Sequence, residues 1–380
     1  REAFSRGAEQ GYDPDPRGLP AAREAIAEYY AGEAERRAMP AVAPRSGAKA
    51  GRGGEEVSAE GIHCTSSSSE AYSMLFKLLC EPGDEICIPH PAYPLFSWLA
   101  ALDAVSVQPY DLRLAPDGRW RIDMHSLDMA MTERTRAVIV VNPSNPAANY
   151  LRPEEFAQLD SLCARKDVAL VTDEVFWDYP LDERIDVEGL RQRTAGISGE
   201  SLRFTINGLS KLLALPQMKL GWILTAGPPR LRDEALARLD VIADAYLSVS
   251  TPVMTAAPSL LALRHGIQEQ IRVRCVENLA VARRYFPGIG EGSVMTEHRM
   301  RSEGALLLPE GGWSAMLALP PDTDEDALAL RLLDERGVLV HPGSLFDIPR
   351  GKHLVLSLLS RPTEFETGLR ALLASLENPM

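Results

Sequence analysis

The stretch Ile62-His63-Cys64-Thr65-Ser66-Ser67-Ser68-Ser69-Glu70 decides the fold. A short apolar strand ends there in small polar residues, and a helix-forming run follows as far as Leu79. Ser67 and Glu70 have the spacing of a capping box, which predicts that the helix begins at the serines. A strand that leads through a polar turn into a helix is the repeating unit of α/β proteins.

The same alternation continues toward the C-terminus. Short β-rich runs are predicted at 85–89, 105–110, 137–141, 168–172, 203–206 and 221–225, and the segments between them include a helix at 154–166. Strands that alternate with helices favour a mostly parallel, doubly wound sheet. Before this region, Leu19-Pro20 begins a helix that should end before Pro40, because proline suits the first helical position.

After Pro229 the pattern predicts helices at 231–245, 251–263 and 267–285, then strands at 305–308, 313–319 and 338–340 with helices at 325–335 and 363–375. We therefore predict an α/β protein with a large domain that carries the functional site. A smaller α/β domain is expected to be built from both chain ends. The predicted boundaries are 1–50 for an N-terminal segment and helix in the small domain, 51–250 for the large domain and 251–380 for the C-terminal small domain.

Composition narrows the class of protein. A chain of 380 residues is too long for one small core, and a net charge of −13 argues against nucleic acid or an anionic membrane as a partner. The five cysteines show no C-x-x-C spacing, which indicates free buried thiols in a reducing compartment. We find no signal peptide or membrane-length apolar run, so a cytoplasmic location is predicted. The chain begins without methionine, and we expect a short N-terminal piece to be missing.

Lys211 is the most unusual lysine of the chain. It lies in Asn207-Gly208-Leu209-Ser210-Lys211, directly after a predicted strand, and apolar residues flank it on both sides. An amine in apolar surroundings loses proton affinity and becomes a candidate Schiff-base nucleophile. For a lone lysine, a solvated surface charge is the plainer alternative.

Other polar or aromatic residues follow the predicted strands, where α/β sheets collect ligands. The serines at 66–69 would form an anion seat at a helix N-terminus or a plain N-cap. The run Asn142-Pro143-Ser144-Asn145-Pro146 is either part of a site or a tight turn, and Asp173 is a site carboxylate, a metal ligand or a helix cap. Tyr93 would face a ligand or pack in the core.

Together these residues fit one cofactor and no metal. A pyridinium ring needs a carboxylate at its nitrogen, a donor at its phenolic oxygen, a phosphate seat, an aromatic plate and a lysine amine. These roles would be filled, in that order, by Asp173, Asn145, Ser67 to Ser69, Tyr93 and Lys211.

This ordered set resembles the fold-type I pyridoxal-phosphate enzymes of the class I/II aminotransferase family, and the resemblance covers essentially the whole chain. It implies pyridoxal 5'-phosphate as cofactor and Lys211 as the Schiff-base residue that moves a proton. It also implies that Asp173 keeps the ring nitrogen protonated, that Asn145 donates to the phenolic oxygen and that Tyr93 stacks on the ring.

The resemblance extends to the phosphate and to the assembly. It implies that Ser67, Ser68, Ser69 and Ser210 hold phosphate, and that Lys219 stands where the family has a phosphate-binding arginine. Tyr12 is similar to the residue that reaches the partner's phosphate, which implies a homodimer with shared active sites.

Several positions depart from the family pattern. Phe176 replaces a tyrosine and cannot donate to the phenolic oxygen, which should raise the pKa of the Schiff base. Gly208 replaces a serine, and Ala147-Ala148 replaces Thr-Gly. Val355 stands where an arginine usually clamps the substrate carboxylate. Arg361 would substitute for that arginine, or is a surface residue.

We predict a pyridoxal-phosphate-dependent aminotransferase that moves an amino group from an amino acid or related amine to a 2-oxo acid. A lyase, cyclase or synthase that uses the same carbanion, similar to the aminocyclopropane-carboxylate synthases or C–S lyases, is the first alternative. A non-catalytic regulatory domain that binds the cofactor is the second.

Overall fold

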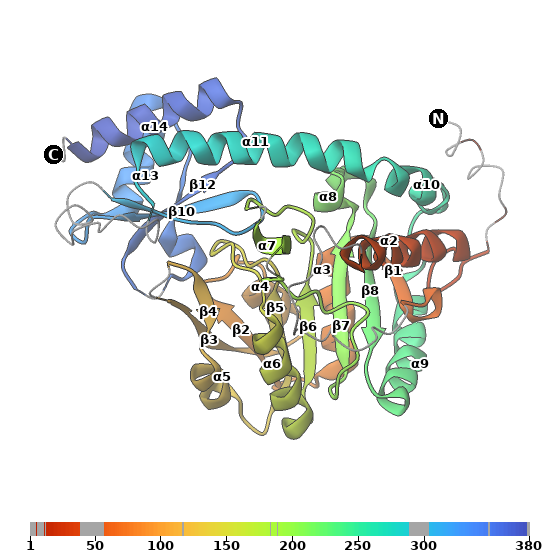
Figure 1. The fold of residues 1–380 in the computed structure, drawn as a ribbon. Coiled ribbons are helices and arrows are strands. Elements are labelled where there is room, and N and C mark those ends of the chain that lie inside the picture. The colour runs from red at the N-terminus through yellow and green to blue at the C-terminus, as the bar shows by residue number, and fades with distance from the viewer. Residues whose placement is uncertain are drawn as a thin grey trace, which may run out of the picture.

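An eight-stranded sheet forms the larger part of the protein (Figure 1). The computed structural model describes residues 5, 11, 13–38, 57–115, 118–182, 184–187, 189–288, 304–348 and 350–377. The sheet order is β1-β8-β7-β6-β5-β2-β3-β4. In chain order its strands are Ile62–Thr65 (β1), Glu85–His90 (β2), Ser106–Leu114 (β3), Trp120–Ile122 (β4), Thr135–Val141 (β5), Ala169–Asp173 (β6), Arg203–Gly208 (β7) and Gly221–Ala226 (β8).

The predicted doubly wound α/β fold is confirmed. The central pairs β2–β3, β2–β5, β5–β6 and β6–β7 are parallel, whereas β8 is antiparallel to both of its neighbours and β4 is antiparallel to β3. Because β8 reverses direction between β7 and β1, those two strands point the same way. The carboxyl ends of most strands therefore meet at one edge of the sheet.

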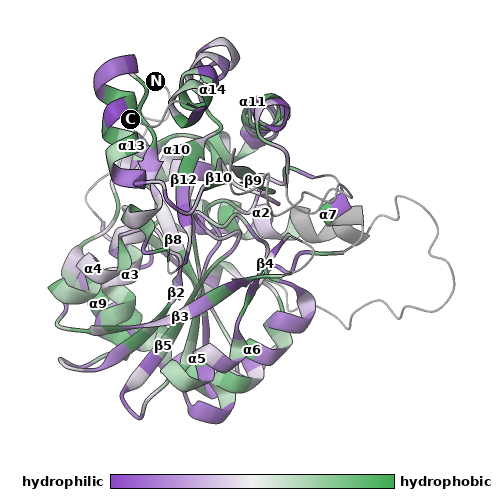
Figure 2. Cartoon of the chain, turned by 90° about the vertical axis from the view of Figure 1, so that its left-hand side faces the viewer, coloured by the Kyte–Doolittle hydropathy of each residue, from purple (hydrophilic) through white to green (hydrophobic). Residues whose placement is uncertain are grey.

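Helices cover both faces of this sheet (Figure 2). One face is covered by α3 (Ser68–Leu79), α4 (Phe96–Leu102) and α9 (Pro229–Tyr246), and the other by α5 (Met124–Ala130) and α6 (Pro153–Lys166). The side chains of β5 alternate between the two cores: Ala137 and Ile139 pack on the α3 side, and Val138 and Val140 on the α6 side. A strand that is buried on both faces is continuously apolar for this reason.

A smaller antiparallel sheet lies near the C-terminus, in the order β11-β12-β10-β9. Its strands are His341–Pro342 (β11), Lys352–Ser357 (β12), Ser314–Leu319 (β10) and Ala305–Leu307 (β9), and α13 (Glu325–Arg336) and α14 (Pro362–Glu377) pack on it. The helix α11 (Arg264–Tyr285) runs from α10 (Thr251–Ala262), beside the larger sheet, to this smaller unit (Figure 1).

The predicted strand at 338–340 is wrong. These residues are irregular, and the strand nearby is the two-residue β11. Gly337, at φ 63°, ends α13, and the backbone N–H of Val338 donates to Leu332 O at 3.0 Å. The helix cap therefore uses the N–H that a strand would have offered to its neighbour.

The N-terminal helix α2 (Pro20–Ala38) packs on α10 and β1. Its buried residues Ile26, Tyr29 and Tyr30 join the core around Trp222, whose Nε1 donates to Tyr30 Oη at 2.9 Å. The division of the chain at residues 50 and 250 remains a prediction.

All five cysteines are free, as expected, and four of them are buried. Within the described ranges, no helix has both the length and the apolar character needed to cross a membrane.

Candidate active site

The polar residues singled out in the sequence lie at the carboxyl edge of the larger sheet. The backbone N–H of Asn142, directly after β5, donates to Asp173 O at the end of β6, at 2.8 Å. Gly221, at the start of the reversed strand β8, lies opposite both Thr65 of β1 and Gly208 of β7. The serine, asparagine, aspartate and lysine segments are therefore brought to one edge from positions that extend from Ser66 to Lys211 in the sequence.

Lys211 lies in the short helix α8 (Leu209–Leu212), which follows β7. Its Nζ is 5.6 Å from the ring centre of Phe176 and 5.5 Å from that of Trp313. Burial lowers the pKa of the Lys211 amine, and the negative charge of Asp173 opposes this shift. A lowered amine pKa increases the fraction of neutral, nucleophilic amine near pH 7.

Asp173 ends β6 as a buried carboxylate with partners on both oxygens. Val175 N donates to its Oδ1 at 3.1 Å, and Tyr72 Oη donates to its Oδ2 at 3.0 Å. Burial raises the pKa of Asp173 to about 6, although both hydrogen bonds oppose this shift. The neighbouring Glu174 points away into its own pair with Arg193, whose Nε lies 2.9 Å from Glu174 Oε2.

The serine segment forms the N-terminus of α3, as predicted. Ser67 is the N-cap, and its Oγ accepts from Glu70 N at 3.1 Å. The return bond differs from a capping box, because Glu70 accepts from Ser66 N, at 2.5 Å, instead of Ser67 N. Ser68 and Ser69 form the first turn of α3, where free N–H groups and the helix dipole attract anions.

Close packing beside the serines explains Gly208. A Cβ at Gly208 would lie 2.9 Å from Gly221 Cα, and one at Gly221 would lie 3.2 Å from Ser67 C. Three backbones therefore touch at this point, and a serine side chain at 208 would have no room. Ser210 is half-buried just beyond it, and Lys219 is exposed at φ 53°.

Asn145 is half-buried in the turn after β5, and this turn is joined to the smaller sheet. Ala148, at φ 58°, offers its carbonyl to the N–H groups of both Glu310 and Gly311, at 2.9 and 3.1 Å. Glu310 also accepts from Arg119 Nη1 at 2.7 Å and pairs with the buried Arg152. These contacts join the turn after β5 to the Glu310–Gly311 segment between β9 and β10, and we call them the link between the two sheets. They hold the smaller sheet in a fixed position relative to the carboxyl edge of the larger one.

Trp313 follows the linked residues Glu310 and Gly311 in the chain, and this position places its ring beside Lys211. Gly312 N donates to Tyr179 O at 2.9 Å, and Trp313 packs edge-on against Phe176 and Tyr179. A Cβ at Gly311 would come within 2.6 Å of the Tyr150 ring, so the close approach requires glycine. Sequence reasoning missed Trp313, although the Gly311-Gly312 pair before it was a usable signal for such an approach.

Val355 belongs to an apolar cluster of the smaller sheet, and the exposed His341 lies opposite it on β11. Val355 of β12 is buried and pairs with Met316 of β10, and both belong to the cluster that includes Phe346. The Phe346 ring lies 6.4 Å from that of Tyr93, which follows β2 and is 51% exposed. The side chain of Arg361 is 78% exposed and lies 3.7 Å from Glu364, which favours the surface-residue interpretation.

Two remaining residues complete the comparison with the sequence. Tyr12 lies outside the described residues, so its reach toward a partner remains a prediction. Tyr72 was also missed, because nothing in the sequence of α3 links it to Asp173, 101 residues away.

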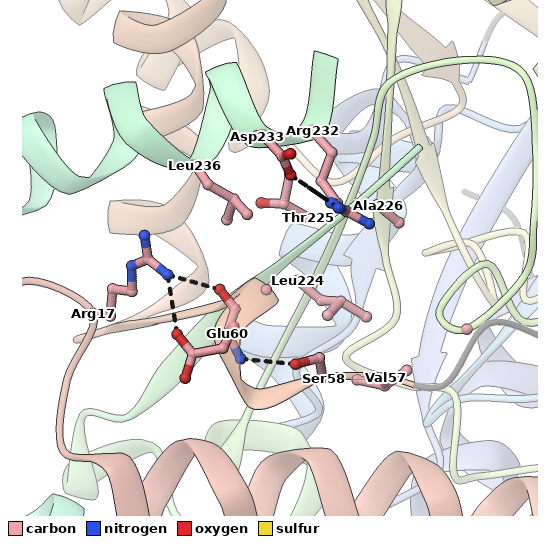
Figure 3. A pocket seen from close by; sticks show the side chains of 12 residues that line it. Arg17, Val57, Ser58, Glu60, Leu224, Thr225, Ala226, Arg232, Asp233 and Leu236 are labelled. Carbon is pink, nitrogen blue, oxygen red and sulfur yellow. Dashed lines mark hydrogen bonds and ion pairs between the residues drawn. The ribbon is translucent and has the colours of Figure 1, made fainter. Parts of the chain in front are cut away.

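A separate pocket of about 260 Å³ lies at the opposite end of β8 (Figure 3). Arg17 contacts Glu60 at 3.4 Å, and Arg232 contacts Asp233 at 2.9 Å, so charged groups on its wall pair with one another. Of the predicted site residues that the structure describes, none lines this pocket.

Comparison with known proteins gives one consistent family. A family model described as aminotransferase class I and II matches residues 7–360. The chain is 25% identical over 307 residues to an alanine aminotransferase of Mycobacterium tuberculosis, covering 78% of this chain and 66% of that protein. It is 27% identical over 249 residues to nicotianamine aminotransferase 1 of Oryza sativa, covering 64% of this chain and 44% of that protein. The matched part thus spans less than two thirds of the length of these relatives.

Solved structures share the fold. An aminotransferase from Escherichia coli superposes with a TM-score of 0.79 at 21% identity, covering 100% of this chain and 87% of that one. An alanine aminotransferase from Pyrococcus furiosus gives a TM-score of 0.78 at 20% identity, covering 99% and 87%. At these identities the likeness shows the fold alone.

Proposed function

The chain belongs to the class I and II aminotransferases, and from this premise we propose that it is an enzyme that transfers an amino group from an amino acid or related amine to a 2-oxo acid, with pyridoxal 5'-phosphate as its cofactor. One observation carries the proposal. A partly desolvated lysine, Lys211, and a buried carboxylate, Asp173, face the same edge of the sheet closely enough to influence each other's pKa.

The donor set fits this cofactor. Its phosphate would be held at the N-terminus of α3 by Ser67, Ser68 and Ser69, with Ser210 and Lys219 beside them. Asp173 would accept a hydrogen bond from the ring nitrogen, and Asn145 would donate to the phenolic oxygen. Tyr93 would cover one face of the ring. When bound, the cofactor supplies a carbonyl that condenses with amines and a ring that withdraws electrons from the substrate α-carbon.

Lys211 would act at its Nζ as both nucleophile and proton carrier. Its pKa is lowered by burial, so more of the amine is neutral and able to accept a proton near pH 7. The ring centres of Phe176 and Trp313 lie 5.6 and 5.5 Å from this Nζ and the rings cover part of it, so the amine is half-buried. Tyr179 Oη donates to Lys211 O at 2.7 Å and holds the backbone from which the amine extends.

Asp173 would act as a fixed negative charge. An ionised carboxylate favours a proton on a ring nitrogen next to it, and the carboxylate is costly to bury unless such a partner is present. The pKa of Asp173 is raised because the buried carboxylate has lost its hydration.

The substrate end supports an apolar amine donor. Val355, Met316 and Phe346 offer no charge to a substrate carboxylate. Arg119 and Arg152, which reach the link between the sheets, are both engaged by Glu310. We therefore propose that the amine donor has a hydrophobic non-reacting end. Because position 355 is valine, no guanidinium at that position binds a carboxylate of the donor.

The proposal also includes the oligomeric state and the cellular location of the enzyme. A homodimer with shared sites is supported by the family's resemblance at Tyr12, and a cytoplasmic location by five free thiols.

The test is to add pyridoxal phosphate to the purified protein and record the absorbance of the lysine-linked cofactor. Lys211→Ala should abolish this absorbance and lower amino transfer by at least about 100-fold, the usual minimum for loss of a general base. Lys166→Ala is the matched control, because Lys166 is a half-exposed lysine on α6 that pairs with Asp128. An unchanged absorbance in Lys211→Ala would refute the proposal.

Incubation with amine donors separates the reaction classes. Amino transfer leaves the cofactor in its aminated form until a 2-oxo acid is added. Elimination would return the original absorbance and release a small product, which would favour the lyase alternative.

A further inference from the structure

Tyr72 is a buried tyrosine that the proposed mechanism does not use. It lies in α3, its side chain is fully buried, and its Oη donates to Asp173 Oδ2 at 3.0 Å. Its ring packs edge-on against Phe96 at 5.2 Å and lies 6.0 Å from Phe76. This packing fixes the direction of the hydroxyl.

We propose that Tyr72 is a positioning residue that holds Asp173 ionised and in one orientation toward the ring nitrogen of the cofactor. The inference rests on the proposed function, because it assigns Asp173 to that nitrogen. With Val175 N on Oδ1 and Tyr72 Oη on Oδ2, each oxygen of the carboxylate has one donor. Each oxygen retains a second acceptor position for a ligand.

The electrostatic surroundings explain why such a donor is needed. Asp173 is buried, and both burial and the charge of Glu174 raise its pKa, while Lys211 on α8 lowers it. A hydrogen bond from Tyr72 favours the ionised form and opposes the effect of burial. Without it, a larger fraction of Asp173 would be protonated near neutral pH and unable to pair with a pyridinium.

The position of Tyr72 on α3 gives it a second effect. The same helix begins with the proposed phosphate seat at Ser67, and Tyr72 follows about one turn later. One rigid helix thus contacts the proposed phosphate site and the carboxylate that would face the ring nitrogen. The distance between these two points is therefore set within a single element of structure.

The experiment measures binding of pyridoxal phosphate to the cofactor-free protein, so its readout is independent of turnover. In Tyr72→Phe we expect binding to be about twofold weaker at pH 7 and about tenfold weaker at pH 5, because a pKa rise of about one unit from about 6 lowers the ionised fraction of Asp173 by these factors. The pH at which binding weakens on the acid side should move upward by about the same unit. The phosphate titrates alike in all variants, and the pKa of Lys211 changes only through the charge of Asp173, so the difference between variants reports Asp173.

Tyr110→Phe is the matched control. Tyr110 is also fully buried, and its Oη donates to Ile139 O at 2.8 Å instead of to a carboxylate. The Tyr110→Phe variant therefore shows how much stability and cofactor binding change when a buried hydroxyl that does not contact a carboxylate is removed. We expect its binding constant and pH dependence to match those of the wild type, with thermal stability measured for both variants.

A double-mutant cycle tests whether Tyr72 acts through Asp173. In an Asp173→Asn background, Tyr72→Phe should change cofactor binding at pH 5 by less than about twofold, against about tenfold in the wild-type background. Tyr72→Met removes the hydroxyl in a different apolar side chain and should give the same pH shift as Tyr72→Phe. Equal binding by wild type, Tyr72→Phe and Tyr72→Met would overturn the inference. A wild type that forms no Lys211-dependent absorbance would instead refute the proposed function.

Discussion

The surroundings of Asp173 and those of Val355 differ in the kind of side chain that they contain. Around Asp173 the side chains are polar, buried and paired: Tyr72 donates to one oxygen, and the adjacent Glu174 accepts from Arg193 and from Thr194 N. Around Val355 the buried side chains are apolar, with Met316 and Phe346 in the same cluster, and the exposed His341 lies opposite it on β11. A buried charge without a partner is costly, so polar groups persist only where partners are supplied. We infer that the surroundings of Asp173 fix the chemistry and that those of Val355 select the substrate.

The strand geometry behind this difference is simple. Side chains alternate along β12, so Val355 faces the larger sheet while Leu354 and Leu356 pack beneath α11 and α14. A charge at 355 would enter an apolar cluster. One substitution would therefore change this cluster, whereas the surroundings of Asp173 depend on several matched partners.

The largest effect is expected at the polar end, for Asp173→Asn. Loss of the charge should lower amino transfer by roughly 100- to 1,000-fold, the scale for removal of one electrostatic group. The cofactor-free variant should nevertheless be more stable than the wild type by up to about 3 kcal/mol at pH 8, because burial raises the pKa of Asp173 from 3.8 to about 6.

The sign of this stability change can be checked by denaturation at several pH values. A raised folded-state pKa contributes stability below pH 3.8, and that contribution is lost as the pH rises through about 6. The stability difference between the variant and the wild type should therefore grow between these values and level off above them. A constant difference would contradict a raised pKa for Asp173.

At the substrate end, Val355→Arg should shift preference toward donors that carry a carboxylate. A charge-assisted pair is worth about 1.5–3 kcal/mol, so the ratio of kcat/KM for an α-amino acid to that for the matching amine should rise on the order of 10- to 100-fold. The variant should also lose stability, because an arginine enters an apolar cluster. Val355→Met, which adds volume without charge, should leave the ratio unchanged.

Phe176→Tyr tests the role of the ring beside Lys211, which lies between the Asp173 and Val355 regions. A hydroxyl added to the ring beside Lys211 would donate to the ionised phenolic oxygen and favour the deprotonated linkage. The pKa read from the absorbance of the lysine-linked cofactor should fall by about one unit. An equal pKa in both proteins would mean that the added hydroxyl does not reach that oxygen.

The smallest effect is expected for Ser67→Ala. Loss of the N-cap bond to Glu70 N should reduce the free energy of unfolding by about 1 kcal/mol. Phosphate affinity should fall with it, while the Asp173-dependent pH profile should stay unchanged. Ser73→Ala, in the same helix but on the α4 side, should leave phosphate affinity unaltered.

Much of the fold could be predicted from local pattern. The strand–serine–helix stretch at 62–79, the later alternation and the glycine and proline signals give every strand of the larger sheet except β4, which is three residues long. The strand at 338–340 failed because the β-branched Val338 and Val340 also suit a loop that packs on the core of the smaller unit, and the cap at Gly337 distinguishes the two.

The candidate site was predictable where its residues follow strands. Lys211, Asp173, Asn145 and the serines were found because chain order alone places them at strand ends. Tyr72 and Trp313 were not found, since each reaches the site from a helix or a link whose local pattern is only that of packing.

The sequence by itself determined the class of fold and the chemical types available at the carboxyl edge, because strand and helix periodicity and turn composition are local properties. The tertiary structure decided which of these groups meet. The close contact of Gly208 with Gly221, the bond from Tyr72 to Asp173 and the approach of Trp313 to Lys211 all belong to the environment of the Lys211 amine. Burial and pKa depend on neighbours that are distant in sequence, so these properties exist only once the chain is folded.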